Sequence, residues 1–303
     1  MRDISEVVKD MKDAYIVTCD NNGASHEEDI KLFDNWFENA YKLWQEANPP
    51  TDTWHDVYNL SFGDNPDIFE NWYVGWDIEI AKDLPDDAEW QDYAPLGITC
   101  GAISRGKKVA GVWRSDDNGP MSRGQCRDMV GTLYDLTAKG YLITTWNGLS
   151  FDFQVLAMES EMYKQCAELA IMHVDMMFHV VCAKGFGVSL DSVANAMDVE
   201  GKTDGMSGAL APILWRNGDY NRVLGYVAQD ARSTALVAKA CEDNNRMNWI
   251  TRKGKKSYIN LTNGWLRVRD ANKLPVPDTS WMDDDSIWDR DRFLGWTKEF
   301  VDV

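Results

Sequence analysis

Two hydrophobic periods alternate along this chain and predict where its strands and helices lie. Short runs rich in β-branched and aromatic residues indicate strands, whereas apolar residues spaced three or four apart indicate helices. The predicted strands span residues 73–80, 96–104, 108–114 and 141–146. The predicted helices span residues 122–139, 150–169, 189–197 and 219–243. Three strands, a helix, a strand and then further helices predict an α/β fold with a mixed sheet flanked by helices.

The regions on either side of this α/β pattern differ from it in character. Ahead of it, Ser25-x-x-Glu28 forms a capping-box pattern, and an aromatic stripe through Trp44 predicts an amphipathic helix. Behind it, residues 246–269 have strand-like stretches and turns, and an acidic tail follows. We therefore expect three parts: an acidic N-terminal helical extension at 1–71, a core domain at 72–245, and a C-terminal appendage at 246–303 packed on that core.

Acidic residues outnumber basic ones, and the excess lies mainly at the N-terminal end. The net charge is −18, and residues 1–70 hold 16 Asp and Glu against 5 Lys and Arg. A negative surface repels nucleic acid at long range. The aromatic face of the predicted N-terminal helix must be buried, so the extension either packs on the core domain or binds a protein partner. Residues 246–269 differ, because they hold seven Lys and Arg and no acidic residue.

Cysteine usage and hydropathy bear on the compartment. The six cysteines lack the close pairing of a zinc or redox motif, which predicts reduced, mostly buried thiols. No apolar run approaches the roughly 20 residues that a bilayer span needs, and the first residues have no apolar core typical of a signal peptide. We therefore expect a cytoplasmic protein that does not bind a membrane.

Two carboxylates stand at the end of the first predicted strand of the core domain. In the run Val74–Ile80, Asp77 and Glu79 are two residues apart, so both side chains point to the same face. Buried carboxylates are costly unless a cation or hydrogen bonds compensate them. Oxygen donors of this kind suit Mg²⁺ or Mn²⁺, while a solvated strand end is the simpler alternative.

Two later motifs favour the metal site over the solvated strand end. The strand at 141–146 leads into the motif Asn147-Gly-x-x-Phe-Asp152, which reads as a turn followed by a helix start. In the last predicted helix, Tyr226 and Asp230 are four residues apart and share one face. Three acidic motifs therefore occur along the chain, each on a plausible strand, turn or helix.

Asp-x-Glu, Asn-Gly-x-x-Phe-Asp and Tyr-x-x-x-Asp, in this order, resemble the DEDD superfamily of DnaQ-like 3′–5′ exonucleases. The tyrosine marks the DEDDy branch, since the alternative branch has histidine where this chain has Gly225. Between the motifs, His173-Val-Asp-Met, Val188-Ser-Leu-Asp and Gly201-Lys-Thr-Asp-Gly are similar to predicted exonucleases related to the proofreading domain of family B DNA polymerases. The resemblance covers residues 72–245 and implies a ribonuclease-H-like fold.

The resemblance also implies a role for each motif residue in phosphodiester hydrolysis by a two-metal mechanism with Mg²⁺ or Mn²⁺. Asp77 would bridge both ions, and Glu79 would hold the ion that activates water. Asp230 would complete that shell, while Asp152 would act near the second ion. Tyr226 would orient the attacking water by hydrogen bonding, because an ordinary phenol pKa of about 10 disfavours proton abstraction.

Further residues are expected to contact the substrate, a single-stranded 3′ end. The resemblance suggests Asn147 and Phe151 for the terminal nucleotide, although Phe151 could equally pack inside the fold. Lys202 lies in a glycine-bounded loop and is either a phosphate ligand or a solvated lysine. In the basic stretch, Trp249 and Trp265 could stack bases, and four cations could bind upstream phosphates or merely offset the acidic tail. These cations are Arg252, Lys253, Lys255 and Lys256.

The motifs together predict a metal-dependent 3′–5′ exonuclease acting on single-stranded nucleic acid, with DNA favoured. Two alternatives stay open. No motif reads the 2′-hydroxyl, so RNA could be the substrate and the protein an exoribonuclease. The fold could also serve as a non-catalytic binding module, although a buried cluster of like charges has no use in an idle site.

Overall fold

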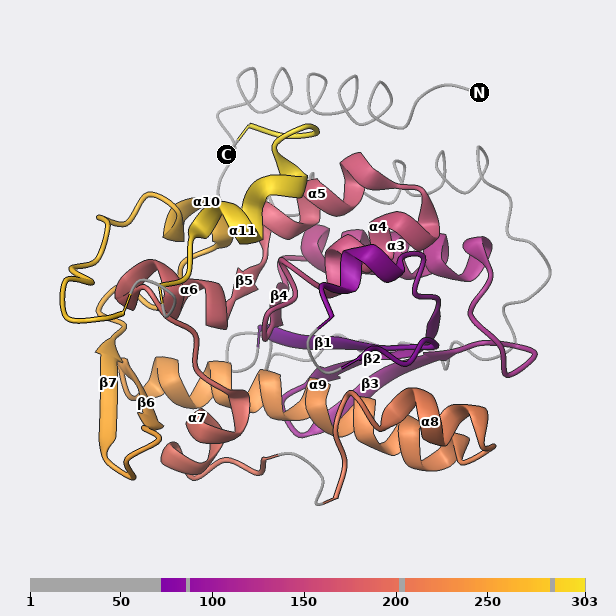
Figure 1. Ribbon diagram of the computed structural model, residues 1–303, viewed down its shortest axis with the longest axis horizontal. Helices are drawn as coiled ribbons and strands as arrows, with labels where there is room; N and C mark the ends of the chain where they lie inside the picture. The colour runs from indigo at the N-terminus through magenta and orange to yellow at the C-terminus, as the bar shows by residue number, and fades with distance from the viewer. Residues whose placement is uncertain (1–71, 86–87, 202–204, 284–286, 303) are drawn as a thin grey trace, which may run out of the picture. The chain divides into compact units, whose positions relative to one another are not determined.

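A five-stranded mixed sheet, in the order β3–β2–β1–β4–β5, lies at the centre of the fold (Figure 1). The computed structural model describes residues 72–85, 88–201, 205–283 and 287–302. The strands are β1 Tyr73–Ile80, β2 Ile98–Arg105, β3 Lys108–Arg114, β4 Leu142–Thr145 and β5 Val174–Asp175. β1 pairs antiparallel with β2 and parallel with β4, so the first strand occupies the middle of the sheet. The predicted α/β fold with a mixed, helix-flanked sheet is confirmed.

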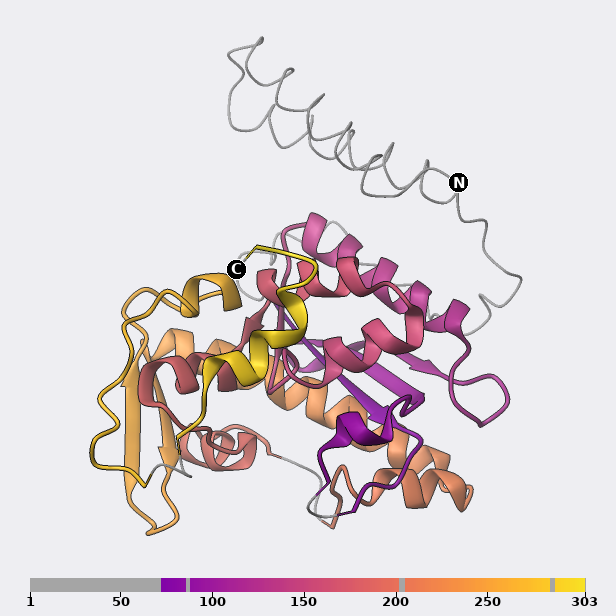
Figure 2. The ribbon, with the colours of Figure 1, turned by 45° about the horizontal axis from the view of Figure 1, so that its top comes forward.

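Helices cover both faces of this sheet (Figures 1 and 2). One face carries α3 Arg123–Ala138, α4 Asp152–Ser160 and α5 Tyr163–Met172, and the other carries α9 Tyr220–Asp243. The alternation of side chains along β1 explains this arrangement. Trp76 and Ile78 belong to the main hydrophobic core, whereas a side chain on Gly75 would point at α9. Asp77 and Glu79 share the parity of Gly75 along the strand and so face α9 as well.

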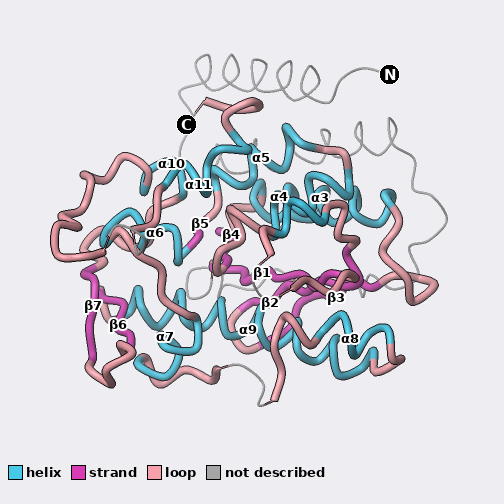
Figure 3. Tube along the Cα trace, in the orientation of Figure 1, coloured by secondary structure: helices cyan, strands magenta, loops and turns pink. Residues whose placement is uncertain are grey.

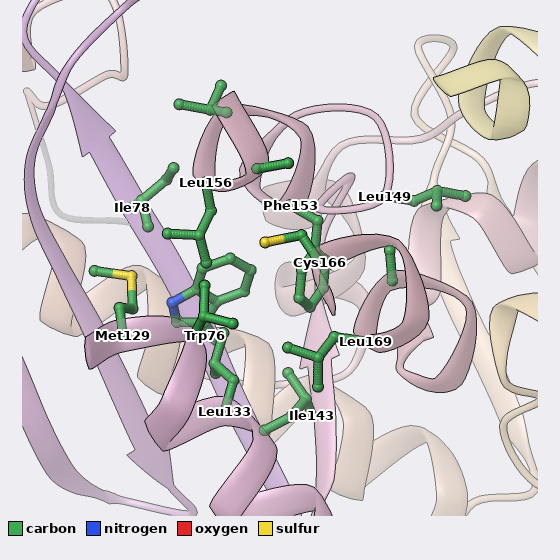
Figure 4. Packing of buried hydrophobic residues seen from close by; sticks show 14 of the residues in the cluster. Trp76, Ile78, Met129, Leu133, Ile143, Leu149, Phe153, Leu156, Cys166 and Leu169 are labelled. Atoms are coloured by element: carbon green, nitrogen blue, oxygen red, sulfur yellow. The ribbon is translucent and has the colours of Figure 1, made fainter. Parts of the chain in front are cut away.

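The main core fills the space between β1 and the helices α3, α4 and α5 (Figure 4). Trp76 of β1 packs against Phe153 of α4, with ring centroids 4.6 Å apart. Met129 and Leu133 come from α3, and Leu169 comes from α5. Burying a large apolar side chain stabilises the fold by about 1.5–3 kcal/mol, so this core holds α4 firmly against the central strand.

Shorter elements connect and extend these layers. They are η3 Trp90–Tyr93, α6 Met176–Lys184, α7 Leu190–Ala196, α8 Ala211–Arg216, α10 Val268–Ala271, α11 Arg290–Leu294 and η5 Gly295–Thr297. A separate two-stranded sheet, β6 Arg246–Ile250 with β7 Lys256–Asn260, follows α9 and lies apart from the main sheet (Figure 3). Met247 and Trp249 of β6 bury themselves in a second apolar cluster with residues of α7 and α9.

The predicted elements match the observed ones closely, with one wrong boundary and four helices that the pattern does not predict, α6, α8, α10 and α11. The single helix expected at 150–169 is wrong, because Glu161 adopts a left-handed φ of 56° and separates α4 from α5. α6 is buried on all sides, so it lacks the polar face that marks a helical period. α8 is only 6 residues long, too short to establish a period. The predicted N-terminal helix lies outside the described residues.

The C-terminal segment lies against the elements before it. Phe293 and Leu294 of α11 belong to the main core. The guanidinium of Arg290 donates to four backbone carbonyl oxygens at 2.7 to 2.9 Å. One of these carbonyls is that of Cys182 in α6, so the guanidinium joins the C-terminal segment to that helix. In the described part of the chain, no helix has the length and apolar character that crossing a membrane requires.

The cysteines within the described ranges are all buried free thiols, as expected from their spacing. They are Cys100, Cys126, Cys166, Cys182 and Cys241. Burial raises the pKa of each, and the carboxylate of Glu79 adds to the effect at Cys100, its cross-strand neighbour on β2.

Candidate active site

Asp77 and Glu79 stand on the central strand, on the face that meets α9. Glu79 is buried and Asp77 is half-buried. Gly75 precedes them on the same face, and its lack of a side chain lets α9 lie directly on the strand. The two carboxylates are therefore close to the side chains that α9 directs toward this part of β1.

The second motif forms the turn after β4 and the start of α4. Asn147 adopts a left-handed backbone with φ of 73°. A Cβ on Gly148 would lie 2.5 Å from Oγ1 of Thr145, so the turn is too tight for another residue there. The turn sets Asp152 at the first position of α4. There, Oδ1 of Asp152 accepts a 3.2 Å hydrogen bond from the backbone N–H of Ile78, the residue between the two β1 carboxylates.

A buried histidine supports this turn from within the core. Nδ1 of His173 donates to the carbonyl oxygen of Ala170 at 2.6 Å, and this leaves Nε2 to accept from the hydroxyl of Thr145 at 2.9 Å. Oγ1 of Thr145 accepts the backbone N–H of Gly148 at 3.1 Å. Burial lowers the pKa of His173 to about 3, so the ring stays neutral at physiological pH. Nδ1 therefore remains the donor and Nε2 the acceptor.

α9 supplies the third motif. Tyr226 and Asp230 lie one turn apart on its buried face. Burial raises the pKa of Tyr226, and the charges of Asp230, Glu79 and Asp77 raise it further, as does its hydrogen bond with Asp230. The phenol therefore keeps its proton at neutral pH and serves as a hydrogen-bond donor.

The three motifs open onto one cavity of about 440 Å³. That volume lies in the range of about 300–1,000 Å³ typical of small-ligand sites. The structure brings seven of the predicted site residues to its wall. They are Asp77, Glu79, Asn147, Phe151, Asp152, Tyr226 and Asp230.

The other residues of the wall are not among the predicted site residues. Trp90 of η3 packs edge-on against Phe151, with ring centroids 5.5 Å apart. Trp146 adds a second indole, and Lys82 is the one cation in the described part of the wall. Trp146 has a recognisable signal, because it directly precedes the second motif. Trp90 has none, because it begins a four-residue 3-10 helix in an otherwise irregular segment.

Like charge accumulates in this cavity. Burial raises the pKa of Asp152 to about 7, with contributions from the charges of Asp175 and Asp230, although the N–H of Ile78 opposes the shift. A divalent cation would offset this repulsion, and carboxylate oxygens are the donors that Mg²⁺ and Mn²⁺ prefer. The donor chemistry therefore fits such ions. Within the described residues, however, no three His, Cys, Asp or Glu side chains form a ready metal-binding group.

The predicted cationic contacts lie away from the cavity. Arg252, Lys253, Lys255 and Lys256 are exposed at and beside the turn that joins β6 to β7. This hairpin follows the C-terminal end of α9, about 20 Å along the helix axis from Asp230 at 1.5 Å per residue. None of the four residues lines the cavity. Lys202 lies outside the described residues.

The expectation that Trp249 and Trp265 stack on bases is wrong. Their exposed fractions are 3% and 7%, and both belong to the second apolar cluster. The indole Nε1 of Trp265 donates to the carbonyl oxygen of Ala238 in α9 at 2.9 Å. Both rings thus fix the hairpin and the segment after it to α9 rather than facing solvent.

Comparisons with known proteins bear on the fold. A family model described as RNase_H superfamily matches residues 104–241. No curated protein matches the chain. Among solved structures, the chain is similar to the family B DNA polymerase from the hyperthermophilic archaeon Pyrobaculum calidifontis, at 17% sequence identity and a TM-score of 0.41. That match covers 56% of this chain and 24% of the polymerase, so the chain corresponds to about a quarter of the polymerase's length.

The family match begins in β2 and ends in α9, so it includes the second and third motifs. β1, with Asp77 and Glu79, precedes the matched residues but forms the middle of the same sheet. The sheet order and the family match are both consistent with an RNase H-like fold in the central part of this chain.

Proposed function

We propose that this protein is a divalent-metal-dependent 3′–5′ exonuclease acting on single-stranded nucleic acid, with DNA as the favoured substrate. The observation that carries the proposal is the convergence of four carboxylates and a tyrosine on one cavity from β1, α4 and α9. Nucleases are common among RNase H-like domains, and residues 104–241 match that superfamily. Reading the motifs as parts of one site agrees with both observations.

In the proposed reaction, the oxygen of a water molecule bonds to the terminal phosphorus while the bond from phosphorus to the 3′ oxygen of the preceding nucleotide breaks. A nucleoside 5′-monophosphate leaves, and the shortened strand keeps a 3′-hydroxyl after its oxygen takes up a proton. Tyr226 keeps its own proton, so its role would be to orient the attacking water by a hydrogen bond. Asn147 and Phe151, on the wall of the cavity, would contact the terminal nucleotide.

Two Mg²⁺ or Mn²⁺ ions, when bound, would activate the water and stabilise the leaving oxygen. Asp77 would serve both ions, Glu79 and Asp230 the first, and Asp152 the second. Ile78 would contribute through its backbone, because its N–H fixes one oxygen of Asp152 beside β1.

The direct test is hydrolysis of a 5′-labelled single-stranded DNA with and without Mg²⁺ or Mn²⁺. We expect a ladder of products that shorten from the 3′ end, and no hydrolysis in chelator. Asp77→Asn and Asp230→Asn should each lower the rate by on the order of 100-fold or more, since metal-assisted charge stabilisation contributes several kcal/mol. Asp117→Asn is a matched control, because Asp117 is a fully exposed carboxylate outside the cavity.

A second readout needs no turnover. Mn²⁺ alone should raise the melting temperature of the wild type, because an ion that binds only the folded state stabilises it by mass action. The shift should be lost in Asp77→Asn and kept in Asp117→Asn. Full activity in chelator, or in Asp77→Asn, would contradict the two-metal proposal.

The choice of substrate separates the alternatives. DNA and RNA strands of the same sequence should be compared, together with a circular single strand and a strand blocked by a 3′-phosphate. The proposal expects faster hydrolysis of DNA and none of the circle. Preference for RNA would indicate an exoribonuclease, and binding without hydrolysis of either strand would indicate a non-catalytic module.

A further inference from the structure

Leu149, in the turn between β4 and α4, is held at both of its backbone polar groups by side chains from distant parts of the chain. Its N–H donates to Oδ2 of Asp175 at 2.9 Å. Its carbonyl oxygen accepts the indole Nε1–H of Trp296 at 2.7 Å. The two partners are 26 and 147 residues away along the chain. Leu149 itself is completely buried, so no solvent can replace either contact.

The carboxylate of Asp175 serves more than Leu149. Its other oxygen, Oδ1, accepts the backbone N–H groups of Asn147 at 3.1 Å and of Phe178 at 3.0 Å. Asp175 is therefore both the N-cap of α6 and an anchor for two residues of the turn. The bond to Asn147 helps to hold that residue in its left-handed conformation.

Trp296 belongs to the C-terminal segment, far from the turn in sequence. It lies in η5 and is half-buried against the main core. η5 follows directly on α11, whose Phe293 and Leu294 are part of that core. The indole is thus presented to Leu149 from a firmly packed segment rather than from a loose tail.

The position of this peptide matters to the cavity. Asn147 and Phe151, on either side of Leu149, line its wall, and Asp152 follows. The backbone N–H of Phe153 donates to the carbonyl oxygen of Gly148 at 2.9 Å, so a movement of the turn is passed to the first turn of α4. A displacement of about 1 Å in a reacting group can lower a rate about 100-fold.

We propose that Asp175 and Trp296 are positioning residues of the active site, which set the place of Asn147 and Asp152 by clamping the Leu149 peptide between them. This inference rests on the proposed exonuclease function for its effect on rate. It makes the C-terminal segment a structural part of the site, although no residue of that segment reaches the cavity wall in the described ranges.

Each of two substitutions removes one of the two side-chain hydrogen bonds to the Leu149 backbone. In Asp175→Asn, Oδ1 can keep the N–H donors of Asn147 and Phe178, but the amide nitrogen replaces Oδ2 and cannot accept the N–H of Leu149, so the bond to Leu149 is lost. In Trp296→Phe, the ring stays apolar and the indole donor to the Leu149 carbonyl is removed. Each variant should lower kcat by about 10- to 100-fold, the range for residues that orient catalytic groups. KM for a short single strand should change by less than about threefold.

A surface turn provides matched controls. The carboxylate of Asp278 accepts the N–H of Ser280 at 3.0 Å, and the indole Nε1 of Trp281 donates to the carbonyl oxygen of Asp278 at 3.1 Å. Asp278→Asn and Trp281→Phe therefore make the same chemical changes at exposed positions outside the cavity. Both control variants should keep wild-type kcat.

Amide hydrogen exchange tests the clamp without requiring activity. Exchange in a peptide covering residues 146–151 should be about tenfold faster in Asp175→Asn, because a buried N–H has lost its acceptor. Peptides from β1 and α9 should exchange as in the wild type. The double variant should lose less activity than the product of the two single losses, because both act through one peptide.

The outcomes separate the clamp from the function it serves. Unchanged exchange at 146–151 would overturn the clamp, whatever the activity. Faster exchange with wild-type kcat in both variants, or fully multiplicative losses in the double variant, would overturn the positioning role. A wild type that hydrolyses no substrate would refute the proposed function, while the exchange experiment would still decide whether Asp175 holds the turn.

Discussion

A Cβ placed on Gly75 of β1 would lie 2.0 Å from the carbonyl oxygen of Ala231 in α9 and 2.8 Å from the backbone nitrogen of Ala235. Both neighbours are helix backbone, which cannot turn aside as a flexible side chain can. The strand and the helix therefore touch at Gly75, which precedes Asp77 on the same face of β1, and at Ala231, which directly follows Asp230 in α9. This contact sets the separation between the first and third motifs.

Gly75→Ala should therefore damage both stability and activity. The added methyl must push α9 away from β1, and such overpacking typically costs about 1–3 kcal/mol. Urea denaturation should show a lower midpoint, and hydrolysis should fall because Asp77 and Asp230 move apart. Gly225→Ala, on the exposed side of α9 with no atom near its Cβ, is the control. It should stabilise the protein by about 0.5–1 kcal/mol through helix propensity.

Tyr226→Phe should lower kcat by on the order of 10- to 1,000-fold with little change in substrate binding, if the hydroxyl orients the attacking water. Because the raised pKa keeps the phenol protonated, the loss should not depend on pH between about 6 and 9. Steady-state kinetics at several pH values would measure this. Tyr220→Phe, at the start of the same helix and outside the cavity, should behave like the wild type. An unchanged rate for Tyr226→Phe would mean that this tyrosine only packs.

The exposed cations of the β6–β7 hairpin should bind the upstream part of a long strand. We expect the triple variant Lys253→Glu, Lys255→Glu, Lys256→Glu to bind long single strands more weakly. The slope of log affinity against log salt should become shallower by about 2, at about 0.7 per lost phosphate contact. Hydrolysis of a dinucleotide should change little, because the hairpin is remote from the cavity.

An unchanged salt slope in that triple variant would assign the binding of upstream phosphates elsewhere. Lys107 and Lys108, at the turn between β2 and β3, are then the next cations to exchange. The sequence has no acidic residue from 246 to 269, so the hairpin charge is the strongest local attraction that the chain offers to a polyanion.

Acid should destabilise the fold partly through His173. Burial lowers its pKa to about 3, whereas an unfolded histidine has a pKa of about 6.5. Between these values only the unfolded chain binds the proton. The contribution of His173 to the free energy of unfolding is therefore fully present above pH 6.5 and is lost as the pH falls toward 3. The contribution is at most about 1.4 kcal/mol per pH unit. Urea denaturation at pH 7 and pH 5 should show a smaller pH dependence in His173→Gln than in the wild type, and equal dependences would contradict this assignment.

The side-chain periodicity of strands and helices explains which parts of the site could be predicted from the sequence. Asp77 and Glu79 share a face because a strand repeats every two residues, and Tyr226 and Asp230 share one because a helix returns after four. The cap of α7 is equally local, because the side chain of Ser189 accepts the backbone N–H of Ser192, three residues later. Each of these relationships depends only on neighbours along the chain.

Relationships between distant residues could not be predicted in this way. The contact between Leu149 and Trp296 joins positions 147 residues apart, and nothing near either residue marks it. Trp90 reaches the cavity from the start of a four-residue 3-10 helix, which is too short for a hydrophobic period to describe. The cations of the β6–β7 hairpin follow α9 directly in sequence but do not line the cavity, because a long helix carries its two ends apart.

The reactivity of the buried thiols toward alkylating reagents reports local unfolding of the protein. Alkylating reagents attack the thiolate, and at neutral pH the raised pKa values leave almost none of it in the closed structure. Reaction therefore waits for a local opening that exposes the sulfur to water. Cys100 reports separation of the sheet from α9, Cys126 and Cys166 report separation of α3 and α5 from the core, and Cys241 reports release of the C-terminal end of α9. Alkylation followed residue by residue would thus rank these parts of the fold by how often each one opens, without any introduced label.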